Sequence, residues 1–407
     1  MATQRKFSLS FKIMIGLILG VIIGLFMQAP AMQTVANGYI KPIGTLFLNA
    51  VKMLIVPLVF SSLVIGTCGL GDAKSVGRIG VKTVVYFLLT TAVAITIGLI
   101  IGNVFNIGGG FAIDAGATYE VKEAPNVVDT LLNIIPSNPL KALVDGNMLQ
   151  IIAFAIFIGA AIMMVGDRAQ PVFKFFDGMA ECMYALIGAI MNFAPYAVCA
   201  LIIPIVAANG PAVILPLLSV IIAVYAGCII HSVVVYSLSV QAVAKVSPIT
   251  FFKKSAESIM FAFTTASSSA TLPISMTAAE RLGAPGPIRS FVLPLGATVN
   301  MDGTALYQGV CALFIANVYG ISLTMGQQLT IVLTCTLASI GTAGVPGAGM
   351  IMLGMVLQSV GLPIEGIALI AGIDRILDMA RTAVNITGDI ACTVVVAASE
   401  KELNPID

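Results

Sequence analysis

The chain has few charged residues and a single histidine. Charged side chains make up only 10% of its 407 residues, and the net charge is +1. This balance gives no reason to expect nucleic acid or an acidic macromolecule as a partner. The one histidine, His231, stands in an apolar run without a cluster of cysteines or histidines. We therefore interpret it as a satisfied interior residue rather than a metal ligand.

Cysteine does not occur in any pattern that would indicate disulfides or a metal site. The seven cysteines are odd in number, widely spaced and mostly placed in apolar runs. That distribution is typical of buried side chains that serve packing.

Apolar sequence, by contrast, is abundant. Hydrophobic residues make up 58% of the chain and the mean hydropathy is +1.04, which predicts an integral membrane protein with several spans. Arg5, Lys6 and Lys12 precede an apolar run that begins at Ile13 and lacks a small-residue cleavage signature. We expect this run to be a retained first span and the N-terminus to be cytoplasmic.

The apolar runs and their interruptions predict an all-α polytopic membrane protein. Two segments, 253–280 and 325–360, are interrupted near the centre and are predicted to be re-entrant helical hairpins. Eight further runs are predicted to be transmembrane helices: 13–29, 44–67, 83–105, 127–166, 170–207, 212–242, 287–319 and 366–398.

The interruptions have a composition suited to function. Residues 266–271 are rich in serine, 296–304 bring polar residues into an apolar span, and 339–349 are rich in glycine. Glycine lets a backbone approach a ligand closely, although close helix packing alone would also favour small residues. Irregular backbone at membrane depth is tolerated only against protein or a water-filled cavity. Two interrupted segments in corresponding positions indicate a transporter built from inverted repeats.

The last apolar helix carries a polar face between residues 374 and 389. At about 100° per residue, these polar side chains fall within about 60° of Asp378. They are Asp374, Arg375, Asp378, Arg381, Thr382, Asn385 and Asp389. A soluble amphipathic helix would present such a face to water. In a chain of this composition, however, buried ionisable side chains are costly and usually line a site or pathway.

Two pairs of carboxylates and amides are suited to cations. Asp302 stands near Asn300, and Asp389 stands near Asn385. With carbonyl groups freed by the interrupted span, they offer sites made of oxygen alone. Such sites suit hard monovalent cations, and the absence of cysteine and histidine argues against transition metals.

An arginine and an aspartate on the same face are suited to an acidic amino acid. Arg381 has the geometry for a two-pronged pair with a carboxylate. Asp378, one turn away, is suited to an ammonium group.

These motifs resemble the glutamate transporter family. This is the dicarboxylate/amino acid:cation symporter family, which includes the animal excitatory amino-acid transporters. The resemblance covers essentially the whole chain. It rests on the serines at 267–269, on Asn-Met-Asp-Gly-Thr at 300–304, on the 339–349 tip and on Asp-x-x-Arg-Thr-x-x-Asn-x-x-x-Asp at 378–389.

The resemblance implies a transporter, not an enzyme, in a prokaryotic plasma (inner) membrane surrounded by lipid. It implies a homotrimer with a trimerisation scaffold formed by residues 1–82 and 111–210. Residues 83–110 and 211–407 would form a mobile transport domain that carries the substrate across as an elevator. The second hairpin would be the outer gate.

The resemblance also implies the roles of individual residues. Asp378 would hold the amino group of the substrate, Arg381 its side-chain carboxylate and Asn385 its main-chain carboxylate. The substrate contacts would be Ser268, Thr304, Val345, Gly349, Asp378, Arg381, Thr382 and Asn385.

The resemblance also implies three sodium sites. The first would consist of Gly296, Asn300, Asn385 and Asp389, the second of Thr298, Ser339, Ile340 and Thr342, and the third of Phe87, Thr90, Thr91, Asn300 and Asp302. A tyrosine is common in the family where this chain has Phe87. The change is harmless if only the carbonyl group of that residue binds the ion.

One arginine departs from the family pattern. Archaeal members have an arginine just before the serines of the first hairpin, where this chain has Ala266. Animal members have one in the last helix at the position of Met379. Here Arg375 stands one turn earlier, and its long stem could reach toward the first hairpin. We expect it to neutralise the crowded aspartates and to modulate transport without contacting substrate.

Alternatives within the family differ in the coupling ion and substrate. Proton-coupled glutamate or C4-dicarboxylate symporters tend to carry a glutamate in the first hairpin tip, where this chain has Ser269, and asparagine at the position of Asp389. Dicarboxylate members tend to lack the aspartate found here as Asp378. Glutamate and aspartate themselves differ by one methylene, which is discriminated by only about 1–3 kcal/mol.

Two enzyme classes are alternatives outside the transporter family. An intramembrane aspartyl protease could use Asp302 and Asp378, but the Gly-x-Gly-Asp signature is absent and Arg381 would hold both carboxylates ionised. A serine hydrolase using residues 267–269 would lack both the Gly-x-Ser-x-Gly motif and a nearby histidine.

Overall fold

The computed structural model describes residues 9–69, 77–111, 135–339 and 348–405. Within these ranges every regular element is a helix, which confirms the predicted all-α class. Arg5 and Lys6, and most of the second hairpin tip, lie outside the described residues.

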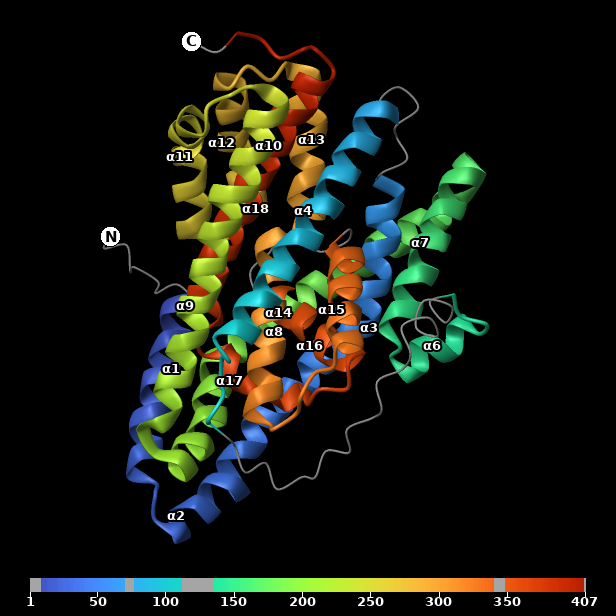
Figure 1. Cartoon of the computed structure of the whole chain (residues 1–407). Helices are drawn as coiled ribbons and strands as arrows, with labels where there is room; N and C mark the ends of the chain where they lie inside the picture. The colour runs from blue at the N-terminus through green and yellow to red at the C-terminus, as the bar shows by residue number, and fades with distance from the viewer. Residues whose placement is uncertain (1–8, 70–76, 112–134, 340–347, 406–407) are drawn as a thin grey trace, which may run out of the picture.

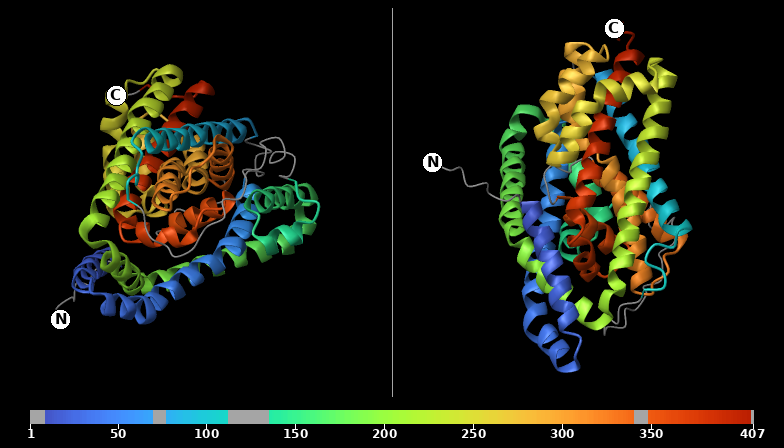
Figure 2. Two further views of the ribbon diagram at one scale, coloured as in Figure 1. Left: turned by 60° about the horizontal axis from the view of Figure 1, so that its bottom comes forward. Right: turned by 90° about the vertical axis from the view of Figure 1, so that its left-hand side faces the viewer.

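The N-terminal helices pack against one another along one side of the molecule. In the left view of Figure 2, α1, α3 and α8 form a wall in blue and green. A row of glycines explains the close packing of α1, because Gly16, Gly20 and Gly24 all face α8 and leave no side chain between the two backbones. These elements are α1 (Leu9–Phe26), α2 (Pro30–Val35), η1 (Ala36–Ile40), α3 (Lys41–Gly69), α6 (Pro139–Asp145), α7 (Met148–Val165), η2 (Gly166–Ala169), α8 (Gln170–Asn209) and η3 (Gly210–Val213).

The C-terminal elements form the other side of the molecule, together with one helix from the N-terminal part of the chain. Here α4 packs against α14, while α11, α13 and α14 pack against α18. The elements are α4 (Gly77–Val104), α9 (Ile214–Ile230), η4 (His231–Tyr236), α10 (Ser237–Ser239), η5 (Val240–Ala244), α11 (Pro248–Thr265), α12 (Ser268–Arg281), α13 (Gly286–Val299), α14 (Asp302–Val318), α15 (Met325–Ala338), α16 (Ala348–Ser359), η7 (Ile364–Gly366), α17 (Ile367–Ala371) and α18 (Asp374–Ser399).

The two hairpins enter from opposite ends. In Figure 1, α11 and α12 occupy the upper part of the molecule, whereas α15 and α16 occupy the lower part. The chain passes between them through α13 and α14, and α18 packs against both helices of the first hairpin. This opposed arrangement agrees with the inverted-repeat interpretation.

Each predicted span overlaps a helix or a run of helices. In the described ranges, four helical stretches are long and apolar enough to cross a membrane: 78–104, 150–208, 214–244 and 374–399. The segment predicted at 127–166 is described only from residue 135, and its break lies at Gly146, whose φ of 67° starts the turn into α7.

The breaks are narrower than predicted. In the first hairpin only Ala266 and Ser267 leave the helix, because the Ser267 side chain accepts a hydrogen bond from the backbone N–H of Ala270 and restarts the helix at once. In the span predicted to be interrupted over 296–304, only Asn300 and Met301 are non-helical.

Candidate functional site

A single face of α18 carries most of the site. Residues 374, 378, 381, 385 and 389 follow one another at intervals of three or four, so an uninterrupted helix places them in one row. This row takes part in two buried groups of polar residues, the second of which also includes residues of the α13–α14 break. We call Asp374, Asp378 and Arg381 the arginine cluster, and Asn300, Asp302 and Asp389 the carboxylate cluster.

The arginine cluster pairs its one guanidinium with both of its carboxylates. The Nη1 atom of Arg381 lies 2.9 Å from Oδ1 of Asp374, and Nη2 lies 2.8 Å from Oδ1 of Asp378. The guanidinium also stacks 4.1 Å above the ring centroid of Tyr307. Arg381 is only 1% exposed, and a charge this deeply buried is tolerated only when it is paired and hydrogen-bonded.

The second hairpin and α14 both approach this guanidinium. A methyl group at Gly349, in α16, would lie 2.9 Å from the guanidinium carbon of Arg381. A methyl group at Gly303 would collide with the backbone of Arg381. The Nε atom of Arg381 is buried and has no hydrogen-bond partner among the described residues. A ligand carboxylate could therefore use a donor that the protein leaves open.

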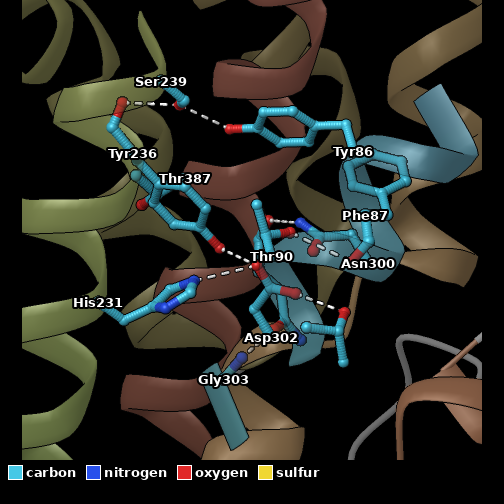
Figure 3. Close-up of polar contacts among 12 residues, drawn as sticks. Tyr86, Phe87, Thr90, His231, Tyr236, Ser239, Asn300, Asp302, Gly303 and Thr387 are labelled. Atoms are coloured by element: carbon cyan, nitrogen blue, oxygen red, sulfur yellow. Dashed lines mark hydrogen bonds and ion pairs between the residues drawn. The ribbon is translucent and has the colours of Figure 1, made fainter. Parts of the chain in front are cut away.

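The carboxylate cluster is held by hydroxyl, imidazole and amide groups. Thr91 donates to Oδ1 of Asp302 at 2.6 Å, and Tyr236 donates to Oδ2 at 2.7 Å (Figure 3). The Nε2 atom of His231 lies 3.1 Å from the same Oδ2. Asp389 accepts a hydrogen bond from the side-chain amide of Asn300 at 2.9 Å.

The α13–α14 break is tied to α18 by its two asparagines. Asn300 donates to the carbonyl oxygen of Asn385 at 2.7 Å, and Oδ1 of Asn385 accepts from the backbone N–H of Gly303 at 2.9 Å. The Oδ1 atom of Asn300 is buried and has no hydrogen-bond partner in the described part of the chain. A buried acceptor without a donor is costly, and a cation would satisfy it.

The donor atoms of the carboxylate cluster are those that suit a hard monovalent cation. Asp302 and Asp389 are 0% and 1% exposed. Within the described ranges, none of the hydrogen-bonding partners of these two carboxylates is a lysine or an arginine. Those ranges also contain no group of three or more histidines, cysteines, aspartates or glutamates that could hold a metal ion. The atoms available to bind an ion are therefore oxygens of carboxylate, amide, hydroxyl and carbonyl groups, which hard cations prefer.

Several predicted site residues lie together. Phe87, Thr90, Asn300 and Asp302 appear side by side in Figure 3, with the hydroxyl of Thr90 donating to the carbonyl oxygen of Phe87 at 3.2 Å. Gly296 lies against Asp389, where a methyl group would collide with the carboxylate.

Other residues predicted to bind substrate or sodium have no described hydrogen bond to the arginine cluster or the carboxylate cluster. Thr304 and Ser339 line one small pocket together with Met301, Gln308, Cys335 and Met352. Ser268 and Thr382 are buried. Thr298 is exposed and donates back to Leu295. Ile340, Thr342 and Val345 lie outside the described residues.

The side chain of Arg375 reaches the first hairpin. Its Nη2 atom donates to the carbonyl oxygens of Thr264 at 3.3 Å and Thr265 at 3.2 Å, at the C-terminal end of α11. Its Nη1 atom lies 3.9 Å from Asp378. Arg375 thus contacts the residues next to Ala266 and the edge of the arginine cluster at once.

Sequence reasoning missed two residues of the site, His231 as a partner of Asp302 and Tyr236 altogether. His231 is satisfied at Nε2, as interpreted, but its partner is a predicted cation ligand. A spacing of five residues puts two side chains about 140° apart on an α-helix. The structure has a π-helical segment from 231 to 236 instead, and this brings both side chains to Asp302.

Comparison with known proteins gives a consistent result. The sodium:dicarboxylate symporter family model matches residues 9–399. The chain is 40% identical to the proton/sodium-glutamate symport protein of Bacillus subtilis, over 98% of this chain and 94% of that protein. It is 35% identical to the proton/glutamate-aspartate symporter of Escherichia coli, over 98% and 94%. It is also 35% identical to C4-dicarboxylate transport protein 1 of Ralstonia nicotianae, over 97% and 92%.

Proposed function

The chain belongs to the sodium:dicarboxylate symporter family, and from this premise we propose that it couples sodium to the uptake of acidic amino acids, glutamate or aspartate. One observation carries the proposal. Two fully buried carboxylates, Asp302 and Asp389, have no lysine or arginine among their described hydrogen-bond partners, and they lie beside Oδ1 of Asn300, a buried acceptor with no described partner. Buried negative charge of this kind is stabilised by a bound cation.

The arginine cluster supports an acidic amino acid as the substrate. Arg381 and Asp378 satisfy each other's charge through a contact of 2.8 Å. An acidic amino acid brings a carboxylate for Arg381 and an ammonium group for Asp378, so binding would exchange one ion pair for two. A C4-dicarboxylate has no ammonium group and would leave Asp378 facing a second negative charge, which disfavours it.

The coupling ions would be three sodium ions. Asn300, Asp302, Thr90, Thr91 and Phe87 would bind one of them, and the contact from Thr91 to Asp302 supports this site. A second site would use Gly296, Asn300, Asn385 and Asp389. The third would use Thr298, Ser339, Ile340 and Thr342.

An elevator mechanism in a homotrimer would use two parts of the chain. Residues 1–82 and 111–210 would form the trimerisation scaffold, and 83–110 and 211–407 the transport domain. Two contacts between these parts involve glycines on the transport side, where Leu17 lies against Gly372 and Ile55 against Gly354. Surfaces without side chains there would ease sliding. The N-terminus would be cytoplasmic, in a bacterial plasma membrane.

Proton coupling is the second candidate, because relatives at 34–40% identity are named as proton symporters. Purified protein in liposomes separates the possibilities. Radiolabelled aspartate, glutamate and succinate are supplied under a sodium gradient or a proton gradient, one at a time. We expect aspartate or glutamate uptake to require the sodium gradient. Uptake that follows the proton gradient and ignores sodium would assign the alternative, and uptake of succinate alone would reject the amino-acid substrate.

A further inference from the structure

One oxygen of Asp302 is fixed by two side chains of the π-helical segment, and the other oxygen faces α4. Tyr236 and His231 both contact Oδ2 (Figure 3), whereas Thr91 is the one hydrogen-bond partner of Oδ1 within the described ranges. We propose that His231 and Tyr236 are positioning residues that hold Asp302 by Oδ2 and thereby set the sodium affinity of the site that Oδ1 helps to form. This inference rests on the proposed sodium-coupled function.

The backbone of this region is shaped for the contact. The helical stretch that begins with α9 runs without interruption from 214 to 244, but within it 231–236 and 240–244 are π-helical. Short π-helical segments are rare and frequently occur at functional sites, because they redirect side chains at the cost of regular hydrogen bonding. Here the redirection brings residues five apart in sequence to the same carboxylate oxygen.

His231 has one polar anchor, and this anchor is Asp302. Its side chain is 0% exposed, and its Nδ1 atom has no hydrogen-bond partner among the described residues. A ring that donates from Nε2 while Nδ1 carries no proton satisfies this arrangement, and we assign that tautomer from the hydrogen bond. The ring therefore serves Asp302 and no other described group.

Tyr236 is held equally firmly. Its ring packs edge to face against His231, with centroids 4.8 Å apart. Its hydroxyl lies against Gly388 of α18, where a methyl group would come within 2.5 Å of both this oxygen and the amide nitrogen of Asn300. The side chain of Ser239 donates to the carbonyl oxygen of Tyr236 at 2.9 Å and contacts the Tyr86 hydroxyl at 2.8 Å, which ties the segment to α4 (Figure 3).

This arrangement makes the two oxygens of Asp302 unequal. With Oδ2 occupied by two donors, the carboxylate cannot rotate to offer both oxygens to an ion. Oδ1 is kept on the side of Thr91. Residues that orient a metal ligand in this way typically change affinity by about 10–100-fold when they are lost.

Three variants test the proposal in purified protein in liposomes: Tyr236→Phe, His231→Leu and His231→Gln. The first two each remove a contact to Oδ2, and Tyr236→Phe does so without changing the ring. We expect each to raise the sodium concentration for half-maximal aspartate uptake about tenfold, while the aspartate KM at saturating sodium changes less than twofold. His231→Gln keeps an N–H donor and is expected to restore most of the sodium affinity.

Tyr225→Phe is the matched control on the same helix run. It also removes a tyrosine hydroxyl, one that donates to the carbonyl oxygen of Ile376 at 2.9 Å rather than to Asp302. We expect its sodium dependence to equal that of the wild type. If Tyr236→Phe and His231→Leu lower only the unfolding temperature and leave the sodium dependence unchanged, the positioning role is overturned.

Asp302→Asn separates this inference from the proposed function. A changed sodium dependence in Asp302→Asn, together with wild-type behaviour in Tyr236→Phe and His231→Leu, would reject the positioning role alone. An unchanged sodium dependence in Asp302→Asn would reject the cation site at Asp302 together with the positioning role. Uptake by the wild type that does not depend on sodium would reject the proposed function itself.

Discussion

The arginine cluster and the carboxylate cluster are both buried and share α18, but they differ in charge balance. In the arginine cluster, Asp374 and Asp378 surround Arg381, and Arg375 lies 3.9 Å from Asp378. The carboxylate cluster has two aspartates and, in the described ranges, no basic partner other than a histidine. Counted together with the neighbouring Arg375, the arginine cluster is close to neutral without a ligand, whereas the carboxylate cluster has an excess of negative charge.

This difference indicates which ligand each cluster accepts. A neutral cluster that contains both signs of charge can exchange its internal pair for a zwitterion without leaving a charge unpaired. A cluster with excess negative charge in a low-dielectric environment attracts a cation strongly, because the interaction between charges grows as the dielectric constant falls. The comparison therefore supports the proposal that the amino acid binds at Arg381 and Asp378, and the cations at Asp302 and Asp389.

The largest effect is expected from Arg381→Ala. Removing one partner of a buried charge pair costs about 3–5 kcal/mol, so aspartate affinity should fall more than a hundredfold. Arg281→Ala is the control, because it breaks the pair with Glu257, whose side chains are 52% and 63% exposed, and exposed pairs contribute little. Equilibrium binding of radiolabelled aspartate measures both. Unchanged affinity in Arg381→Ala would reject the assignment of the substrate to this cluster.

Asp389→Asn is expected to act on the ion rather than on the substrate pocket. It keeps the shape of the side chain but removes one of the two unbalanced charges. The sodium concentration for half-maximal uptake should rise about tenfold or more, since changes around a ligand alone often cost that much. Aspartate affinity at saturating sodium should stay close to that of the wild type. A variant with intact sodium dependence but weakened aspartate binding would reverse the two assignments.

A smaller effect is expected from Arg375→Ala. Its guanidinium caps the last carbonyl groups of α11, and a cation at a helix C-terminus contributes about 0.3–1 kcal/mol. The transport rate should fall about two- to fivefold, with little change in aspartate affinity. The double variant Arg375→Ala with Ala266→Arg should recover much of the rate, measured as initial uptake in liposomes. A normal rate in the single variant, or no recovery in the double variant, would contradict a modulatory role.

The smallest effect is expected at the C-terminal end of α18. Hydrogen bonds from Lys82 and Arg78 lower the pKa of Glu400, so its ionised form is favoured in the folded protein. A carboxyl group with a lowered pKa stabilises the fold above its ordinary pKa of 4.5, and this contribution is lost as the pH falls through the lowered value. Glu400→Gln should lower the unfolding temperature slightly at pH 7, and the difference should shrink on acidification. A difference that grows toward low pH would contradict this sign.

Sequence periodicity predicted the row on α18 well, for a physical reason. An uninterrupted helix keeps its turn of about 100° per residue, so Asp374, Asp378 and Arg381 had to lie close together. The reach of Arg375 toward the first hairpin also followed from its angle and the length of its side chain. Its partners there are backbone carbonyl oxygens, which a sequence does not distinguish from one another.

The contacts that sequence could not predict depend on irregular backbone. The π-helical segment that brings Tyr236 to His231 has no signature in an apolar run, and its five-residue spacing points away from a shared face. The widths of the breaks at 266–271 and 296–304 were also overestimated. In the first hairpin, capping by Ser267 ends the irregular region after two residues. Asp374 was placed on the polar face, but its pairing with Arg381 depends on the side-chain rotamer.

The central claim is that aspartate and sodium bind together because the arginine cluster and the carboxylate cluster share α18 and the α13–α14 break. The most direct test is the dissociation constant of aspartate, measured on purified protein over a series of sodium concentrations. Reciprocal linkage predicts that aspartate affinity rises steeply with sodium, with a limiting slope of about three on logarithmic axes if three ions bind with each substrate. An aspartate dissociation constant that does not change with sodium concentration would contradict the account.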